Sequence, residues 1–153
     1  MNNILRALCA GLTVLLLSLA PVRAGTLLVA EPESHQVAFI DTASGQRRAS
    51  APTGADPRDI AISPDGRLAL VSNFGSASLS VLDIASGQVR ATIALAPLQR
   101  PLSVRWLADG KRAVATVQGA ASVALVNISA GRVDAQLGPA AEIERKAALS
   151  KDG

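Results

Sequence analysis

A hexapeptide occurs twice in this chain almost unchanged, and this repeat constrains the fold more than any other feature. DTASGQ occupies residues 41–46 and DIASGQ occupies residues 83–88, an offset of 42. The neighbourhoods 27–46 and 69–88 align without a gap, and a third copy follows at 113–132 at an offset of 44. A fixed period in the forties indicates a repeat architecture, in which each copy forms one structural unit.

A second landmark repeats in the same frame. PRDIAISPDGR occupies 57–67 and PLSVRWLADGK occupies 101–111, again offset by 44. The sequence ALSKDG at 148–153 is similar to the AISPDG part of the first copy. The chain therefore carries the beginning of one more repeat near residue 148.

Each repeat has the pattern of a four-stranded antiparallel meander. In the unit 57–95, short apolar-rich runs cover 59–63, 68–72, 78–83 and 89–95, and turn residues separate them. Residues 78–81 read Ser-Leu-Ser-Val, the alternation of a strand with two different faces. Four runs of about five residues with tight turns between them predict four strands.

The repeated hexapeptide is interpreted as a hairpin connection. Asp41 and Asp83 end a strand, where a carboxylate can accept hydrogen bonds from backbone N–H groups of the turn. Glycine follows at the position that needs a left-handed conformation. The predicted structural turn residues are Asp41, Gly45, Asp65, Gly66, Asp83, Gly87, Asp109, Gly110 and Gly131.

The first 24 residues have the pattern of a cleaved secretory signal. Arg6 precedes an apolar run from Ala7 to Ala20, and Val22-Arg23-Ala24 offers a peptidase site. A membrane anchor is the alternative, but the run is short for a span of about 20 residues. A lipoprotein anchor at Cys9 is not expected, because this cysteine comes too early in the apolar run. We therefore expect a periplasmic or secreted protein, with residues 25–153 as its repeat region.

Composition narrows the expected partners. Cys9 is the only cysteine, so the 129 residues left after the first 24 have no thiol for a disulfide or a metal site. Arg6 and Arg23 belong to the leader, which leaves 13 basic residues against 12 acidic ones. Without a basic run or interleaved aromatic residues, we expect no nucleic-acid partner. No membrane association is expected after cleavage.

The unit resembles the YVTN-repeat β-propellers, the YncE-like family. Leu70-Val71-Ser72-Asn73 stands where that family writes Tyr-Val-Thr-Asn, although this chain has no tyrosine. The resemblance implies an all-β fold of four-stranded propeller blades, with the 59–63 strand innermost and the 89–95 strand outermost. Similar repeats occur in quinoprotein amine dehydrogenases and in propeller lactonases, so they indicate a fold rather than an activity.

The predicted strands make about three blades, which form an incomplete ring. The count of 12 strands includes an innermost strand at 147–150, although 142–149 could instead form a short helix. Propellers close with about four to eight blades. Either the chain is a fragment of a longer propeller, or copies self-associate to complete a ring.

The candidate chemistry is sparse. His35 is the only histidine, and no C-x-x-C-H, G-x-G-x-x-G or P-loop motif is present, so we expect no catalytic group, cofactor or metal. Asp59 begins the innermost strand near the channel mouth, with Arg58 and Arg105 in the same layer. These three could contact a ligand or line a water-filled channel. Trp106 is expected to pack between blades.

Three functional readings remain open. The first is a non-enzymatic binding module that holds an unidentified protein or small-molecule ligand on the face formed by loops between blades. The second is the N-terminal part of a propeller enzyme, lactonase-like or amine dehydrogenase-like. The third is a truncated product without function.

Overall fold

The computed structural model describes residues 25–118 and 122–137. The predicted signal at 1–24, the expected strand at 147–150 and its helical alternative at 142–149 lie outside these residues. The described part forms three antiparallel sheets, which we call blades 1, 2 and 3. The strands are β1 (Thr26–Glu31), β2 (Gln36–Asp41) and β3 (Arg47–Pro52) in blade 1, β4 (Pro57–Ile62), β5 (Leu68–Asn73), β6 (Ser78–Asp83) and β7 (Gln88–Ala94) in blade 2, and β8 (Pro101–Trp106), β9 (Arg112–Val117), β10 (Ser122–Asn127) and β11 (Arg132–Leu137) in blade 3.

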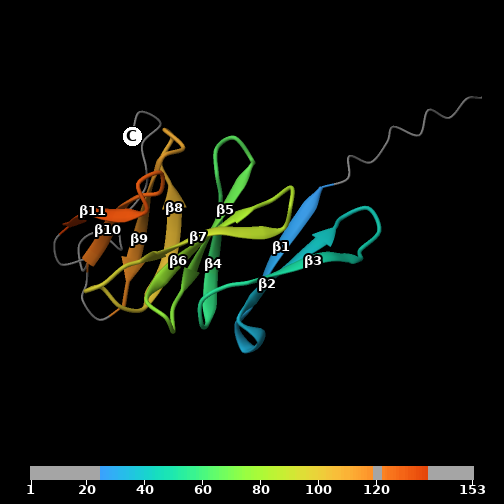
Figure 1. The fold of residues 1–153 in the computed structure, drawn as a ribbon, viewed down its shortest axis with the longest axis horizontal. Helices are drawn as coiled ribbons and strands as arrows, with labels where there is room; N and C mark the ends of the chain where they lie inside the picture. The colour runs from blue at the N-terminus through green and yellow to red at the C-terminus, as the bar shows by residue number, and fades with distance from the viewer. Residues whose placement is uncertain (1–24, 119–121, 138–153) are drawn as a thin grey trace, which may run out of the picture.

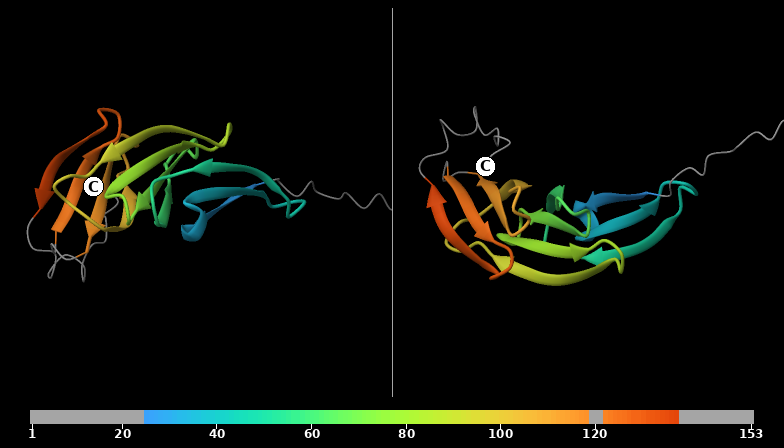
Figure 2. Two further views of the ribbon diagram at one scale, coloured as in Figure 1. Left: turned by 60° about the horizontal axis from the view of Figure 1, so that its bottom comes forward. Right: turned by 90° about the horizontal axis from the view of Figure 1, so that it is seen from above.

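The blades repeat in topology as well as in sequence. Within each sheet, the strands lie in chain order, so every connection between neighbours is a hairpin or short loop. The register between the last two strands shifts at the same repeat position in all three blades, after Phe39, Val81 and Leu125. Figure 1 shows the sheets side by side, and Figure 2 shows them from above as an open arc. The expected all-β, propeller-like fold is confirmed.

Proline and aspartate residues of the repeat lie at the ends of strands. Pro57 and Pro101 begin β4 and β8, where a missing N–H does not interrupt a ladder. Asp41 Oδ1 accepts from the backbone N–H of Ala43 and Ser44, at 3.0 and 2.7 Å. Asp83 Oδ1 accepts from Ser86 N at 2.8 Å. Each of these aspartates thus serves its own hairpin.

The other turn residues have the geometry of tight hairpins. Asp65 Oδ1 accepts from Arg67 N at 3.1 Å, and Asp109 Oδ1 accepts from Lys111 N at 2.8 Å. Five glycines have positive φ between 63° and 71°, a region that favours glycine. They are Gly45, Gly66, Gly87, Gly110 and Gly131.

Asn73, the last residue of the Leu-Val-Ser-Asn stretch, ties two strands together. Its side chain is fully buried at the end of β5. The Nδ2 group donates to Ser78 Oγ and Ser80 Oγ of β6, at 3.0 and 2.9 Å. A buried amide that makes these bonds fixes the β5–β6 loop against its own sheet.

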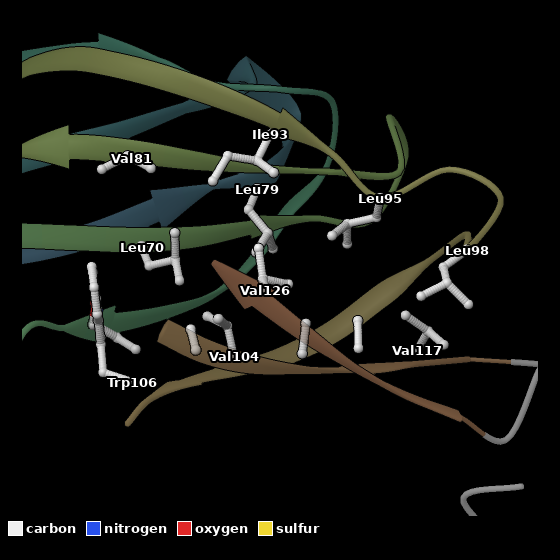
Figure 3. Packing of buried hydrophobic residues seen from close by; sticks show 14 residues of the cluster. Leu70, Leu79, Val81, Ile93, Leu95, Leu98, Val104, Trp106, Val117 and Val126 are labelled. Atoms are coloured by element: carbon white, nitrogen blue, oxygen red, sulfur yellow. The ribbon is translucent and has the colours of Figure 1, made fainter. Parts of the chain in front are cut away.

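Two apolar clusters hold the blades together. Val37, Phe39 and Ala51 of blade 1 pack with Ala69, Val71 and Leu82 of blade 2. A larger cluster joins blades 2 and 3 and includes Leu70, Ile93 and Trp106, as Figure 3 shows.

Trp106 packs between blades as expected. It is almost fully buried, and its Nε1–H donates to the carbonyl of Ala61 in the neighbouring blade at 3.0 Å. Within the described residues, no helix has the length and apolar character to cross a membrane.

Because neighbouring strands are antiparallel, the connections between them lie on two opposite faces of the arc. We call one of them the loop face; it carries the β1–β2, β3–β4, β5–β6, β7–β8 and β9–β10 connections. The opposite one is the hairpin face. Backbone bonds link successive connections along the loop face, such as Thr53 N to His35 O at 2.8 Å and Leu95 N to Ala77 O at 3.0 Å. The loop face is therefore one continuous surface that crosses all the blades.

Candidate functional site

Asp59 joins the inner strands of blades 2 and 3. Its Oδ2 accepts from the backbone N–H of Val104 at 2.9 Å and from Arg105 Nη1 at 2.6 Å. Its Oδ1 accepts from the N–H of Ile60 at 3.0 Å. The carboxylate thus has three donors within the protein, and these contacts connect β4 to β8.

Arg105 is held beside Asp59 but remains open to solvent. Its side chain is 62% exposed, compared with 26% for Asp59. The same Nη1 also donates to the carbonyl of Val104 at 2.6 Å. The structure thus brings together two of the three residues predicted as channel-lining ligand contacts, in an arrangement that also bridges two blades.

Arg58, the third predicted contact, belongs to a different group on the loop face. Its Nη2 donates to Asp56 Oδ2 at 2.8 Å, and its guanidinium lies 4.9 Å from the centre of the Phe74 ring. The hydrogen bond to Asp56 raises the pKa of Arg58 above its usual range. Phe74 is half-buried in the β5–β6 loop.

Arg100 approaches the same ring from the next connection along the chain. Its guanidinium carbon lies 5.9 Å from the Phe74 centroid. Within the described residues, Asp56 pairs with Arg58, and no carboxylate pairs with Arg100. The guanidinium groups of Arg58 in β4 and Arg100 in the β7–β8 connection therefore converge on one aromatic ring, and among the described residues no carboxylate occupies that of Arg100.

Backbone strain is concentrated around this group. His35, Asp56, Ala77 and Arg100 are the described non-glycine residues with positive φ, between 50° and 55°. All four lie in connections of the loop face. Asp56 and Arg100 hold equivalent positions, because each directly precedes the proline that begins an inner strand. Residues in sparsely populated conformations cluster at ligand sites, where the surrounding structure must hold them in place.

His35 lies beside Asp56 and forms part of the same surface. Its Nδ1 accepts from the backbone N–H of Asp56 at 3.2 Å. A shallow, open pocket of about 490 Å³ lies here, lined by Pro32, Glu33, His35, Asp56 and Arg58. We call the residues His35, Asp56, Arg58, Phe74 and Arg100 the loop-face cluster.

A second hollow lies on the hairpin face between blades 1 and 2. It has a volume of about 520 Å³ and contains Arg48, Arg67 and Arg90 together with Asp65 and Asp83. Arg90 Nη2 donates to Asp83 Oδ2 at 2.5 Å, and Arg48 Nη2 donates to the carbonyl of Ile84 at 3.0 Å. Two of its three arginines are thus engaged, and no aromatic ring of the described residues lines this hollow. The loop-face cluster, in which two guanidinium groups meet at one ring, is therefore our candidate for binding an anion.

Sequence reasoning identified Arg58 but missed Phe74 and Arg100. These residues come from separate loops, and nothing in the local pattern shows that they meet. One sequence signal points to Arg100: it precedes Pro101, just as Asp56 precedes the equivalent Pro57 in the previous repeat. Across residues 25–118 and 122–137, no three His, Cys, Asp or Glu side chains gather as a metal site would require.

Comparison with known proteins supports the fold. No protein-family model matches the chain, and no curated protein matches it in sequence. A solved structure described as Kuenenia stuttgartiensis hydrazine synthase superposes with a TM-score of 0.67 at 24% identity. The match covers 72% of this chain and 32% of that chain. Because 737 chains of solved structures match, the architecture is widespread and does not specify an activity.

Proposed function

We propose that this chain is an exported propeller-type binding module of the YVTN-repeat kind, and that its loop face binds an acidic partner. The partner would present a carboxylate or phosphate group to the loop-face cluster. The observation that carries the proposal is the convergence of Arg58 and Arg100 on the Phe74 ring. Export is supported by the leader-like pattern at residues 1–24, and the YVTN assignment by the Leu-Val-Ser-Asn stretch.

The chemistry of the cluster suits an anion next to an apolar surface. A guanidinium group presents a planar fork of donors that matches the geometry of carboxylate and phosphate. Arg58 is engaged by Asp56, so Arg100 supplies the charge that a ligand can neutralise. The half-buried ring of Phe74 keeps part of this surface apolar, which favours a ligand with an apolar body beside its anionic group.

Titration of the folded protein with inorganic phosphate tests this proposal, followed by amide and arginine side-chain NMR resonances. We expect shifts confined to the start of β4, the β5–β6 loop and the β7–β8 connection, which carry Arg58, Phe74 and Arg100. Arg100→Ala should weaken phosphate binding by up to about fivefold, since an exposed ion pair contributes about 0.2–1 kcal/mol. Arg132→Ala removes an exposed arginine from the outer strand of blade 3 and is the matched control.

Two results would count against the proposal. Phosphate shifts that are spread over the surface, or that are equal in both variants, would show that the cluster is not a site. Hydrolysis of lactones or oxidation of amines by the purified protein would instead favour the enzyme reading.

A further inference from the structure

Asp56 differs from the other described aspartates in what holds its carboxylate. Most of them accept a hydrogen bond from a backbone N–H group, as Asp41 and Asp59 do. Among the described residues, the Asp56 carboxylate accepts from Arg58 alone, with Nη2 at 2.8 Å. Because no backbone group uses this carboxylate, its turn does not need it, and the charge can serve another role.

The repeat shows that the backbone at this position does not depend on an aspartate. Arg100 is the equivalent residue of the next repeat, and it has φ of 55° where Asp56 has 53°. The carbonyl groups of both residues accept at 2.9 Å, from the N–H of Phe74 and the N–H of Gln118. Phe74 and Gln118 are themselves equivalent, so the same frame carries a carboxylate in one repeat and a guanidinium in the next. Removal of the Asp56 charge should therefore leave this backbone in place.

The ion pair between Asp56 and Arg58 is open to solvent and can exchange partners. The two side chains are 27% and 50% exposed. An exposed ion pair contributes little net stability, because water solvates both charges and dissolved salt screens them. An external anion that reaches Arg58 therefore has to overcome only a weak internal contact.

The Phe74 ring keeps Arg58 beside Arg100 when this pair opens. Their guanidinium carbons lie 4.9 and 5.9 Å from the ring centroid, within the range of a cation–π contact. With Asp56 displaced, two guanidinium groups without a carboxylate partner among the described residues stand at one ring. A phosphate group has enough terminal oxygens to accept from both, whereas a carboxylate fits a single guanidinium fork.

We propose that the Asp56 carboxylate is an internal competitor at the loop-face cluster, and that a phosphate group displaces it from Arg58 and is then bound by Arg58 and Arg100 together. This inference rests on the proposed function and narrows its ligand class to phosphate groups, such as that of a phosphate monoester. At Arg58, a ligand carboxylate would only replace one carboxylate with another. Phosphate gains over it through its larger charge and its contact with both guanidinium groups.

The phosphate affinity of an Asp56→Asn variant tests this role. Asparagine keeps the size of the side chain and tolerates positive φ, but it removes the competing charge. We expect inorganic phosphate to bind about two- to fivefold more tightly than to the unmodified protein, the range that an exposed ion pair can contribute. Asp134→Asn is the matched control, because Asp134 also forms an exposed ion pair with an arginine two residues away, Arg132. The control changes the net charge equally and should leave phosphate binding unchanged.

An Arg58→Ala background separates competition from simple repulsion. If Asp56 acts by occupying Arg58, the gain from Asp56→Asn should disappear when Arg58 is absent. A gain of the same size in Arg58→Ala would show that the Asp56 charge only repels phosphate from Arg100, and it would overturn the proposal. In the unmodified protein, saturating phosphate should shift the side-chain carboxyl carbon resonance of Asp56, and acetate should not.

The outcomes distinguish this inference from the proposed function. Phosphate binding that depends on Arg100, but that Asp56→Asn leaves unchanged or weakens, would contradict the competitor role and leave the site itself in place. An Asp56 carboxyl resonance that does not respond to phosphate, or that responds equally to acetate, would contradict it in the same way. Absence of Arg100-dependent binding in both the unmodified protein and Asp56→Asn would overturn the inference and the proposed function together.

Discussion

At the residue scale, the contacts of Asp59 distinguish a structural carboxylate from a ligand-binding one. Its Oδ2 accepts from the N–H of Val104, a fully buried residue, and from the exposed guanidinium of Arg105. The hydrogen bond to the buried backbone group should contribute more to stability than the exposed ion pair. The two contributions can be separated, because each partner can be removed alone.

We expect Asp59→Ala to lower the free energy of unfolding by about 1–3 kcal/mol, because it leaves the Val104 N–H without an acceptor. Arg105→Ala should cost less than about 1 kcal/mol, as is usual for exposed ion pairs. Urea unfolding followed by Trp106 fluorescence measures both. Asp59→Asn retains an acceptor oxygen and is the conservative control. Equal losses for Asp59→Ala and Arg105→Ala would assign the stabilisation to the ion pair.

The β8–β9 hairpin provides a pH-dependent prediction. Backbone N–H groups of Lys111 and Arg112 and the Arg112 side chain donate to Asp109. These bonds, led by that from Lys111, lower the pKa of Asp109 from 3.8 to about 2. Because the folded pKa is the lower one, the carboxylate stabilises the fold above pH 3.8, and this contribution is lost as the pH falls through about 2.

Asp109→Asn should therefore be less stable than the unmodified protein at neutral pH, and the difference should shrink as the pH falls from 3.8 toward 2. Urea unfolding at a series of pH values measures it. Glu33→Gln removes an exposed loop carboxylate and should leave stability at neutral pH unchanged. A difference for Asp109→Asn that stays constant across this pH range would show that its hydrogen bonds do not act through ionisation.

At the scale of elements, the two copies of the repeated hexapeptide form equivalent hairpins in different surroundings. Gly45 and Gly87 both have φ of +69°. A Cβ added at Gly45 would have no atom within 4 Å, whereas one at Gly87 would lie 2.9 Å from the Cβ of Ala49 in blade 1. The second hairpin is therefore also an inter-blade contact, and the first is not.

Alanine substitution should separate these two effects. Gly45→Ala should cost about 1–2 kcal/mol from the left-handed backbone alone. Gly87→Ala should cost roughly a further 1 kcal/mol or more, because the added methyl group overpacks against Ala49. Adding Ala49→Gly to Gly87→Ala should restore only the stability that Gly87→Ala loses beyond the loss for Gly45→Ala. Thermal or urea unfolding measures all three. A similar loss of stability in the two single variants would mean that Ala49 of blade 1 moves enough to accommodate the added methyl group.

The sequence predicts the strands and turns of this fold better than the tertiary contacts between them. Period, alternation and turn residues place the described strands to within about two residues, because these signals are local. The position of Trp106 also follows from its size and the repeat. The convergence of Arg58, Phe74 and Arg100 does not follow, since it depends on how strand β4, the β5–β6 loop and the β7–β8 connection are placed in space. The repeated proline specifies only that Asp56 and Arg100 are equivalent.

At the scale of the whole molecule, the described sheets form an open arc, as Figure 2 shows. Leu27, Val29, Ile62 and Leu137 are the exposed large apolar side chains of the described residues, whereas the repeat equivalents of Leu27, Val29 and Leu137 in blade 2 are buried between blades. The residues of the loop-face cluster all belong to one chain, so an acidic ligand can bind there whether or not copies self-associate. Assembly and binding can therefore be tested independently.

The most direct measurement of the central claim is the solution mass of the exported chain, by light scattering after size exclusion, with circular dichroism on the same sample. We propose that copies self-associate through the exposed apolar ends of the arc, which predicts a β-rich species heavier than one chain. Leu137→Asp should shift it toward single chains, whereas Thr92→Asp, on the outer strand of blade 2, should not. A folded, β-rich protein with the mass of one chain would contradict the account.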